Sequence, residues 1–160
     1  MKDPRGIIYK FTPAELQIAD MVALLRHETC NNKKPEQLRL DYIGFLGEMY
    51  IAKLLNVYPD LTTHRRSVVN GSDFGDLVVK NKRIDVKTTE RTDGTIMVKE
   101  KSKNTNIDYY LHLIADPPYI TYIGGISSKV LCQPKNIKVF GFGPVYTVFN
   151  DKLPTDITKW

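Results

Sequence analysis

Two short runs of this chain carry acidic and basic side chains in a pattern that suits a reactive site. They are residues 75–79, with the sequence GDLVV, and residues 84–87, with the sequence IDVK. Successive side chains of a β-strand point to opposite faces, so Asp85 and Lys87 share one face and leave the apolar pair for the core. If the two runs form a hairpin, Asp76 lies close to Asp85 across the ladder.

The side chains of these runs have the groups that metal-assisted hydrolysis needs. Two carboxylates held close together repel each other, and one pKa rises unless a cation neutralises them. Mg²⁺ takes oxygen ligands, typically one or two carboxylates together with water and substrate phosphate. A lysine two residues from such a carboxylate can orient the attacking water or stabilise charge on a phosphate. Asp76, Asp85 and Lys87 therefore suit the hydrolysis of a phosphodiester.

Asp76 followed by Asp85-x-Lys87 resembles the PD-(D/E)XK nuclease superfamily, which has the restriction-endonuclease-like fold. The resemblance implies that Asp76, Asp85 and the main-chain carbonyl of Val86 bind Mg²⁺, for which Mn²⁺ can substitute. It also implies that Lys87 serves the attacking water. A glutamate on the first core helix often assists in this family, and Glu48 is the matching residue here, as a catalytic residue and metal ligand.

The extent of the resemblance is limited. It covers about residues 41–98, and residues 47–52 (GEMYIA) are similar to a helix of several phage and archaeal members, including Holliday-junction resolvases. Gly75 stands where the family name has proline. The family core has a helix between its third and fourth strands, whereas only residues 100–108 are available for one here. We therefore expect that helix to be short or missing.

Each of these site residues has an ordinary alternative. An Asp-x-Lys pattern in a strand also occurs on solvated hairpin faces with a weak ion pair. Asp73 is a rival for the first metal ligand, but Asp76 directly adjoins the apolar run. Glu48 is either a surface helix residue or a site residue. The site is favoured because Gly44 and Gly47 form a smooth strip that another element can approach closely.

The charge of the chain permits a nucleic-acid partner without requiring one. Lys and Arg total 23 against 18 Asp and Glu, and the formal net charge is +5. Phosphates attract basic side chains, and Thr89 points to the same face as Asp85. A solvated charged face, or a plain strand-forming threonine, is the alternative to each contact. The candidate contacts to nucleic acid are Arg65, Arg66, Thr89, Lys99, Lys101 and Lys103.

The composition indicates a folded protein of one domain, residues 1–160. Hydrophobic residues make up 42% and charged residues 26%, which excludes disorder of the whole chain. Two cysteines are too few for a disulfide scaffold. No apolar run approaches the roughly 20 residues that span a bilayer, and the N-terminus predicts no signal peptide. We expect a cytoplasmic location and no membrane partner.

The elements that position the candidate site are predicted from periodicity and end signals. A capping box begins a helix at residue 12 that ends near residue 27, and a second helix runs from residue 35 or 41 to residue 55. Helices followed by a mixed, mainly antiparallel sheet indicate an α+β fold of the α/β-sandwich kind. Strands are expected within residues 65–69, 76–79, 83–89, 95–98, 109–115, 119–126 and 139–149, and a helical turn within 127–131.

These observations lead us to expect a Mg²⁺-dependent DNA endonuclease, with RNA not excluded as the substrate. A structure-selective Holliday-junction resolvase and a non-catalytic nucleic-acid-binding protein on the same scaffold remain the alternatives. Bridging the two strands of a DNA duplex would need a homodimer. The aromatic C-terminal third is expected to supply core or dimer surface in preference to base-stacking platforms.

Overall fold

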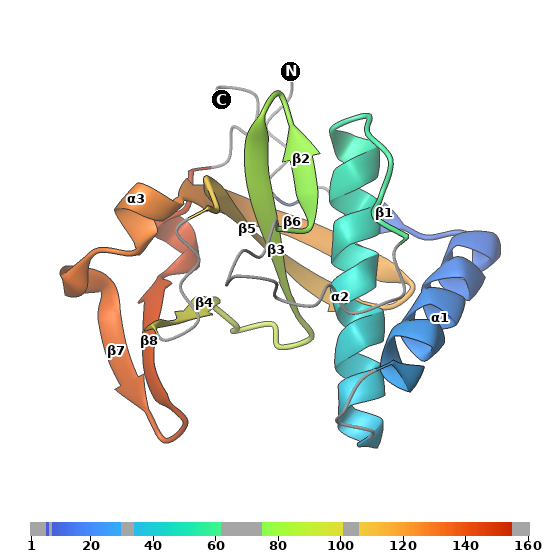
Figure 1. Ribbon diagram of the computed structural model, residues 1–160, viewed down its shortest axis with the longest axis horizontal. Helices are drawn as coiled ribbons and strands as arrows, with labels where there is room; N and C mark the ends of the chain where they lie inside the picture. The colour runs from blue at the N-terminus through green and yellow to red at the C-terminus, as the bar shows by residue number, and fades with distance from the viewer. Residues whose placement is uncertain (1–5, 7, 30–33, 62–74, 101–105, 155–160) are drawn as a thin grey trace.

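The computed structural model in Figure 1 describes residues 6, 8–29, 34–61, 75–100 and 106–154. These residues form a mixed α+β structure with the two long α-helices on one side and two β-sheets. The expected α+β class is confirmed. The expected strand at residues 65–69 lies outside the described residues. Of the helices in the described part of the chain, none is long and apolar enough to cross a bilayer.

Helix α1 (Pro13–Glu28) begins at the capping box that the sequence predicts. The amide of Glu15 donates to Oγ1 of Thr12 at 3.3 Å, and the amide of Thr12 donates to the carboxylate of Glu15 at 2.7 Å. Its buried residues are Ala19, Val22 and Ala23, which recur at helical spacing. This narrow stripe packs α1 against the second helix.

Helix α2 (Pro35–Leu54) is the central helix of the molecule, since one side packs on α1 and the other on a sheet. Gly47 is the point of closest approach, because a Cβ there would lie 1.9 Å from Oγ1 of Thr88. Gly44 has no neighbouring atom within 4 Å of such a Cβ. The predicted smooth strip is therefore confirmed at Gly47 and wrong at Gly44.

The larger sheet, sheet A, has five strands in the order β1-β6-β5-β3-β2. Strands β3 and β5 pair in parallel, and every other pair of the sheet is antiparallel. The predicted hairpin is confirmed in β2 and β3. The strands of sheet A are β1 (Ile8–Lys10), β2 (Leu77–Val79), β3 (Lys82–Thr89), β5 (Tyr109–Asp116) and β6 (Tyr119–Ser127).

A second sheet, sheet B, has the strand order β4-β8-β7 and was not expected from the sequence. Its strands are β4 (Ile96–Lys99), β7 (Ile137–Phe140) and β8 (Gly143–Val148). The predicted single strand region near the C-terminal end is instead the β7–β8 hairpin. Short helices α3 (Ser128–Leu131), η3 (Pro134–Asn136) and η4 (Asn150–Lys152) complete the described elements.

The two sheets explain how the chain crosses from β3 to its parallel partner β5. The crossover passes through β4, and its described residues contain no α-helix. Ile96 and Val98 of β4 pack in a second core with Tyr110 of β5. The first core lies between α2 and the opposite face of sheet A. Sheet B thus covers the face of sheet A that α2 leaves open.

Candidate active site

The short strand β2 places Asp76 at the edge of β3. The amide of Asp76 donates to the carbonyl oxygen of Ile84 at 2.8 Å. The amide of Val86 donates to Oδ2 of Asp76 at 2.6 Å. Strand β3 extends beyond the residues that β2 pairs with, so the carboxylate of Asp76 takes the place of a main-chain acceptor on the exposed ladder.

The main-chain carbonyl group of Val86 points to the same edge of β3. The N–H and C=O of one strand residue point to the same side of the strand, and the N–H of Val86 points to Asp76. The Val86 carbonyl therefore faces the edge at which Asp76 lies. That orientation suits the ligand role implied for Val86, which stays a prediction.

Asp85 and Lys87 lie on the face of β3 that is turned away from α2. Val86 and Thr88 contact α2 at Gly47, and the alternation of β3 places Asp85 and Lys87 opposite them. Nζ of Lys87 lies 2.5 Å from Oδ2 of Asp85. Asp85 is buried, with 8% of its surface exposed, whereas the Lys87 side chain is 39% exposed. The expected pairing on one face is confirmed.

Glu48 reaches the same region from α2. The close approach of Gly47 to β3 brings the next residue, Glu48, to the edge of the sheet with 7% of its surface exposed. Asp76 lies in the plane of the sheet at that edge. Glu48 therefore approaches Asp76 from the α2 side, and Asp85 approaches it from the other side.

The electrostatics of Asp76 show that these carboxylates share one neighbourhood. The pKa of Asp76 is raised well above its usual value, chiefly by burial and then by the charges of Asp85 and Glu48. The hydrogen bond from Val86 and the charge of Lys87 oppose this rise. Three acidic side chains from three elements therefore repel one another here, which is the condition that a bound cation relieves.

Arg26 of α1 is a site residue that the sequence analysis missed. Its two terminal nitrogens donate to the two carboxylate oxygens of Glu48, each at 3.0 Å. Nη2 also donates to the carbonyl oxygen of Asp60 at 3.0 Å. Burial alone lowers the pKa of Arg26, but the hydrogen bonds and charge of Glu48 and the charge of Asp76 raise it.

A signal for Arg26 was present in the sequence. Arg26 is four residues after Val22 and seven after Ala19, so it continues the buried stripe of α1. A charged side chain on a buried stripe requires an oppositely charged partner. That partner is Glu48, and the pairing depends on how α1 packs against α2. No pattern in the neighbouring sequence indicates it.

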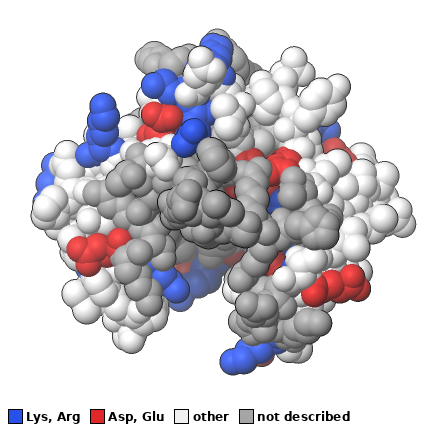
Figure 2. All heavy atoms as spheres, in the orientation of Figure 1, with Lys and Arg blue, Asp and Glu red and all other residues white. Residues whose placement is uncertain are grey.

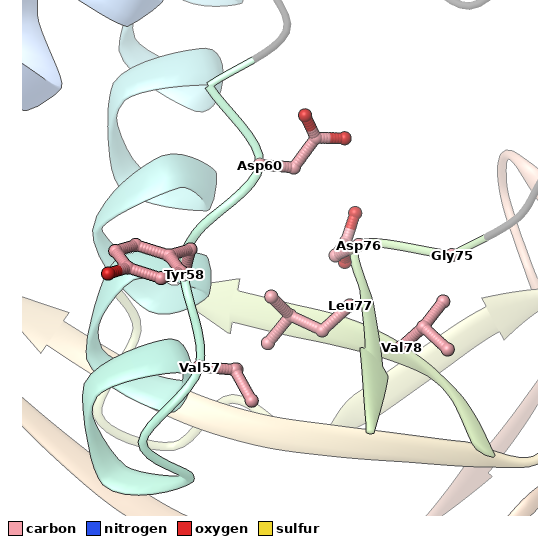
Figure 3. A pocket seen from close by; sticks show the side chains of 7 residues that line it. All are labelled: Val57, Tyr58, Asp60, Gly75, Asp76, Leu77 and Val78. Carbon is pink, nitrogen blue, oxygen red and sulfur yellow. The ribbon is translucent and has the colours of Figure 1, made fainter. Parts of the chain in front are cut away.

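A pocket opens beside Asp76, as Figure 3 shows. Asp60 and Asp76 both line it, and in the view of Figure 3 they lie on opposite sides. The cavity volume is about 160 Å³, which is enough for several waters or a phosphate group. Asp60 was also missed by the sequence analysis. The lining residues are Val57, Tyr58, Asp60, Gly75, Asp76, Leu77 and Val78.

Of the residues expected to contact nucleic acid, the structure describes Thr89 and Lys99, and these two lie in different sheets. Thr89 ends β3, and its Oγ1 accepts a hydrogen bond from the amide of Arg91 at 3.2 Å. Lys99 ends β4 in sheet B, whereas Asp76 lies at the edge of sheet A. Their roles stay predictions. Arg65, Arg66, Asp73, Lys101 and Lys103 lie outside the described residues.

The fit of these residues to a metal ion rests on two carboxylates. Within the described ranges, no group of three or more His, Cys, Asp or Glu side chains is placed to hold a metal. Both carboxylate oxygens of Glu48 accept hydrogen bonds from Arg26, which leaves Asp76 and Asp85 as the candidate acidic ligands. Mg²⁺ needs only one or two carboxylates when water and phosphate complete its shell. The mutual repulsion at Asp76 is consistent with such a site.

Comparison with known proteins identifies no relative: no family model matches the chain, and neither the curated proteins nor the solved structures include a match.

Proposed function

We propose that this protein is a metal-dependent nuclease that hydrolyses phosphodiester bonds of DNA on a restriction-endonuclease-like core. The observation that carries the proposal is the convergence of acidic charge at Asp76, whose pKa is raised by burial, Asp85 and Glu48. The hairpin that holds Asp76, Asp85 and Lys87 together supports it. The parallel partner strand beside β3 also suits a core of this kind.

The roles of the side chains follow from their positions. Asp76 and Asp85, with the Val86 carbonyl, would hold the metal at the edge of β3. When bound, Mg²⁺ offsets charge on the phosphate and lowers the pKa of a coordinated water. Lys87 is exposed enough to orient that water and to stabilise charge on the phosphate. Glu48 assists from the α2 side of Asp76, and hydrogen bonds from Arg26 hold the Glu48 carboxylate in place.

The first test is cleavage of supercoiled plasmid in Mg²⁺ or Mn²⁺. Asp85→Asn removes a charge without changing shape, and Lys87→Ala removes the ammonium group. Each change should slow cleavage by at least about 100-fold, because each removes a group that acts in the transition state. The matched control is Asp93→Asn, since Asp93 is exposed and pairs with Arg91 of its own turn. Wild-type rates in both site variants would refute the proposal.

A non-catalytic nucleic-acid-binding protein is the second candidate. This candidate is favoured because basic side chains of the protein already pair with two of the carboxylates. Arg26 pairs with Glu48, and Lys87 pairs with Asp85. Calorimetric titration with Mn²⁺ separates the two. Binding of Mn²⁺ that disappears in Asp76→Asn supports the nuclease, whereas retained DNA binding with no Mn²⁺ binding supports the second candidate. Four-way junctions compared with linear duplex then test for a resolvase.

A further inference from the structure

Sheet B has one face in the core and one outer face, on which the β8 residues Val145 and Thr147 are also buried while residues of β4 and β7 are exposed. Ile96, Val98, Ile137 and Tyr146 belong to the core shared with sheet A. Side chains alternate along each strand, so the residues between them point to the opposite, outer face. On that outer face Met97, Lys99 and Lys138 are exposed. Figure 1 shows β7 and β8 projecting from the body as a hairpin.

The strand register places two lysines in one row across this outer face. Val145 of β8 pairs with Lys99 of β4 on one side and with Lys138 of β7 on the other. Residues directly opposite one another in a sheet share a face. Neighbouring strands lie about 4.8 Å apart, so the two lysines stand about 10 Å apart over the buried side chain of Val145.

Aromatic rings lie beside these lysines. Nζ of Lys138 lies 4.2 Å from the ring centroid of Phe149, which is 55% exposed. At the tip of the hairpin the rings of Phe140 and Phe142 stack in parallel, with centroids 5.5 Å apart and an interplanar angle of 2°. These two residues are 37% and 58% exposed. These three rings lie on the surface and not in the core, and their expected role as dimer surface stays a prediction.

The chemistry of this face suits one kind of partner. The strands of sheet B contain lysines but no aspartate or glutamate, so the face complements a polyanion. Exposed flat rings near lysines can stack with bases that are not paired in a duplex. We propose that the outer face of sheet B binds a single-stranded segment of nucleic acid. This inference deepens the proposed function by naming the form of its substrate.

The structure fixes this face relative to the candidate active site. Nδ1 of the buried His112 lies 3.2 Å from the carbonyl oxygen of Lys87, and Nε2 lies 3.1 Å from that of Gly94. Asn150, next to Phe149, donates its side-chain amide to the same Gly94 oxygen at 2.9 Å. These hydrogen bonds connect the start of β4 and the end of β8 to β3 at Lys87, so they link a nucleic-acid segment bound on sheet B to the candidate active site.

The test is binding of fluorescein-labelled single-stranded DNA to the full chain in EDTA, followed by anisotropy, with duplex of the same sequence as comparison. Wild-type protein should prefer the single strand. Lys99→Ala with Lys138→Ala should weaken binding about tenfold and lower the slope of log K against log salt by about 0.7 for each phosphate that a lysine no longer neutralises. Phe140→Ser with Phe142→Ser should weaken it at least about fivefold with little change in slope.

The matched control is Lys10→Ala, because Lys10 also lies over an exposed ring, that of Tyr119, but belongs to sheet A. Equal weakening in the control and in the Lys99 and Lys138 variant would overturn the proposal. So would a wild-type preference for duplex, or variants that change only the sedimentation of the protein, which would indicate a second copy as the partner. Single-strand binding without any cleavage would leave this inference standing and remove the nuclease.

Discussion

At the scale of single residues, the hydrogen-bond partners of Glu48 limit the roles that its carboxylate can take in the candidate site. Its carboxylate is nearly buried, and both oxygens accept hydrogen bonds from Arg26. The charge of Arg26 also acts on Asp76. Arg26 therefore offsets part of the acidic charge around Asp76. Arg26 is a positioning residue, because it acts through Glu48.

Replacing Arg26 with glutamine should lower the free energy of unfolding by about 3 kcal/mol, because an acidic side chain is left buried without its ion pair. Glu48→Gln introduced in the same chain should recover part of this stability, since the unpaired charge is then gone. Urea unfolding of the wild type, both single variants and the double variant measures the coupling between the two residues. Strictly additive effects would show that the ion pair between Arg26 and Glu48 contributes no coupling energy.

At the scale of the elements, the correct predictions of helices and strands came from patterns within short stretches of the sequence. The capping box of Thr12 and Glu15 fixed the start of α1, and the alternation of β3 placed Asp85 and Lys87 on one face. Sheet B was missed in part because β4 and β8 pair residues far apart in the sequence, such as Lys99 with Val145, whereas β7 and β8 form a local hairpin where one strand region was predicted. The same holds for Arg26 and Glu48, which meet only after two helices pack. Long-range pairing has no signature in a short window.

The packing of α2 on β3 predicts that alanine substitutions at two glycines of α2 change the free energy of unfolding in opposite directions. Gly47→Ala should lower the free energy of unfolding by about 2 kcal/mol, because the added methyl would meet Thr88 and Val86. The shift of Val86 should also slow any cleavage. Gly44→Ala, in the same helix, should raise stability by up to about 1 kcal/mol, since its Cβ has open space and alanine favours helix. Thermal and urea unfolding check both, and equal effects at the two glycines would contradict this packing.

At the scale of the whole molecule, charge is distributed in small groups. On the face in Figure 2, Lys and Arg side chains lie in separate clusters with Asp and Glu between them. One such group ties together three elements from the N-terminal half. Glu15 of α1 accepts hydrogen bonds from Lys53 of α2 and from Tyr9 of β1, each at 2.8 Å. This group holds β1, and with it the edge of sheet A, against both helices.

This group predicts how the whole molecule responds to acid. Burial raises the pKa of Glu15, but hydrogen bonds from Lys53, Thr12 and Tyr9 outweigh it and lower the pKa to about 2 from 4.5. A carboxylate whose pKa is lowered by folding adds stability that is fully present above its unfolded pKa and is lost as pH falls through the folded pKa. The contribution of Glu15 should therefore disappear between about pH 4.5 and about pH 2.

Urea unfolding at a series of pH values tests this with Glu15→Gln. At pH 7 the variant should be less stable than the wild type by about 1–2 kcal/mol, because charge-assisted hydrogen bonds and the cap are weakened. The difference should shrink steadily from about pH 4.5 to about pH 2, since the carboxylate of the unfolded wild type takes up a proton first, and the folded one is protonated only near pH 2, where it has lost the same charge. Glu28→Gln, at the other end of α1, is the control for general loss of acidic charge. A difference between wild type and Glu15→Gln that stays constant down to pH 2 would mean that the side chain acts by shape and not by charge, and that Lys53 is no partner to it in solution.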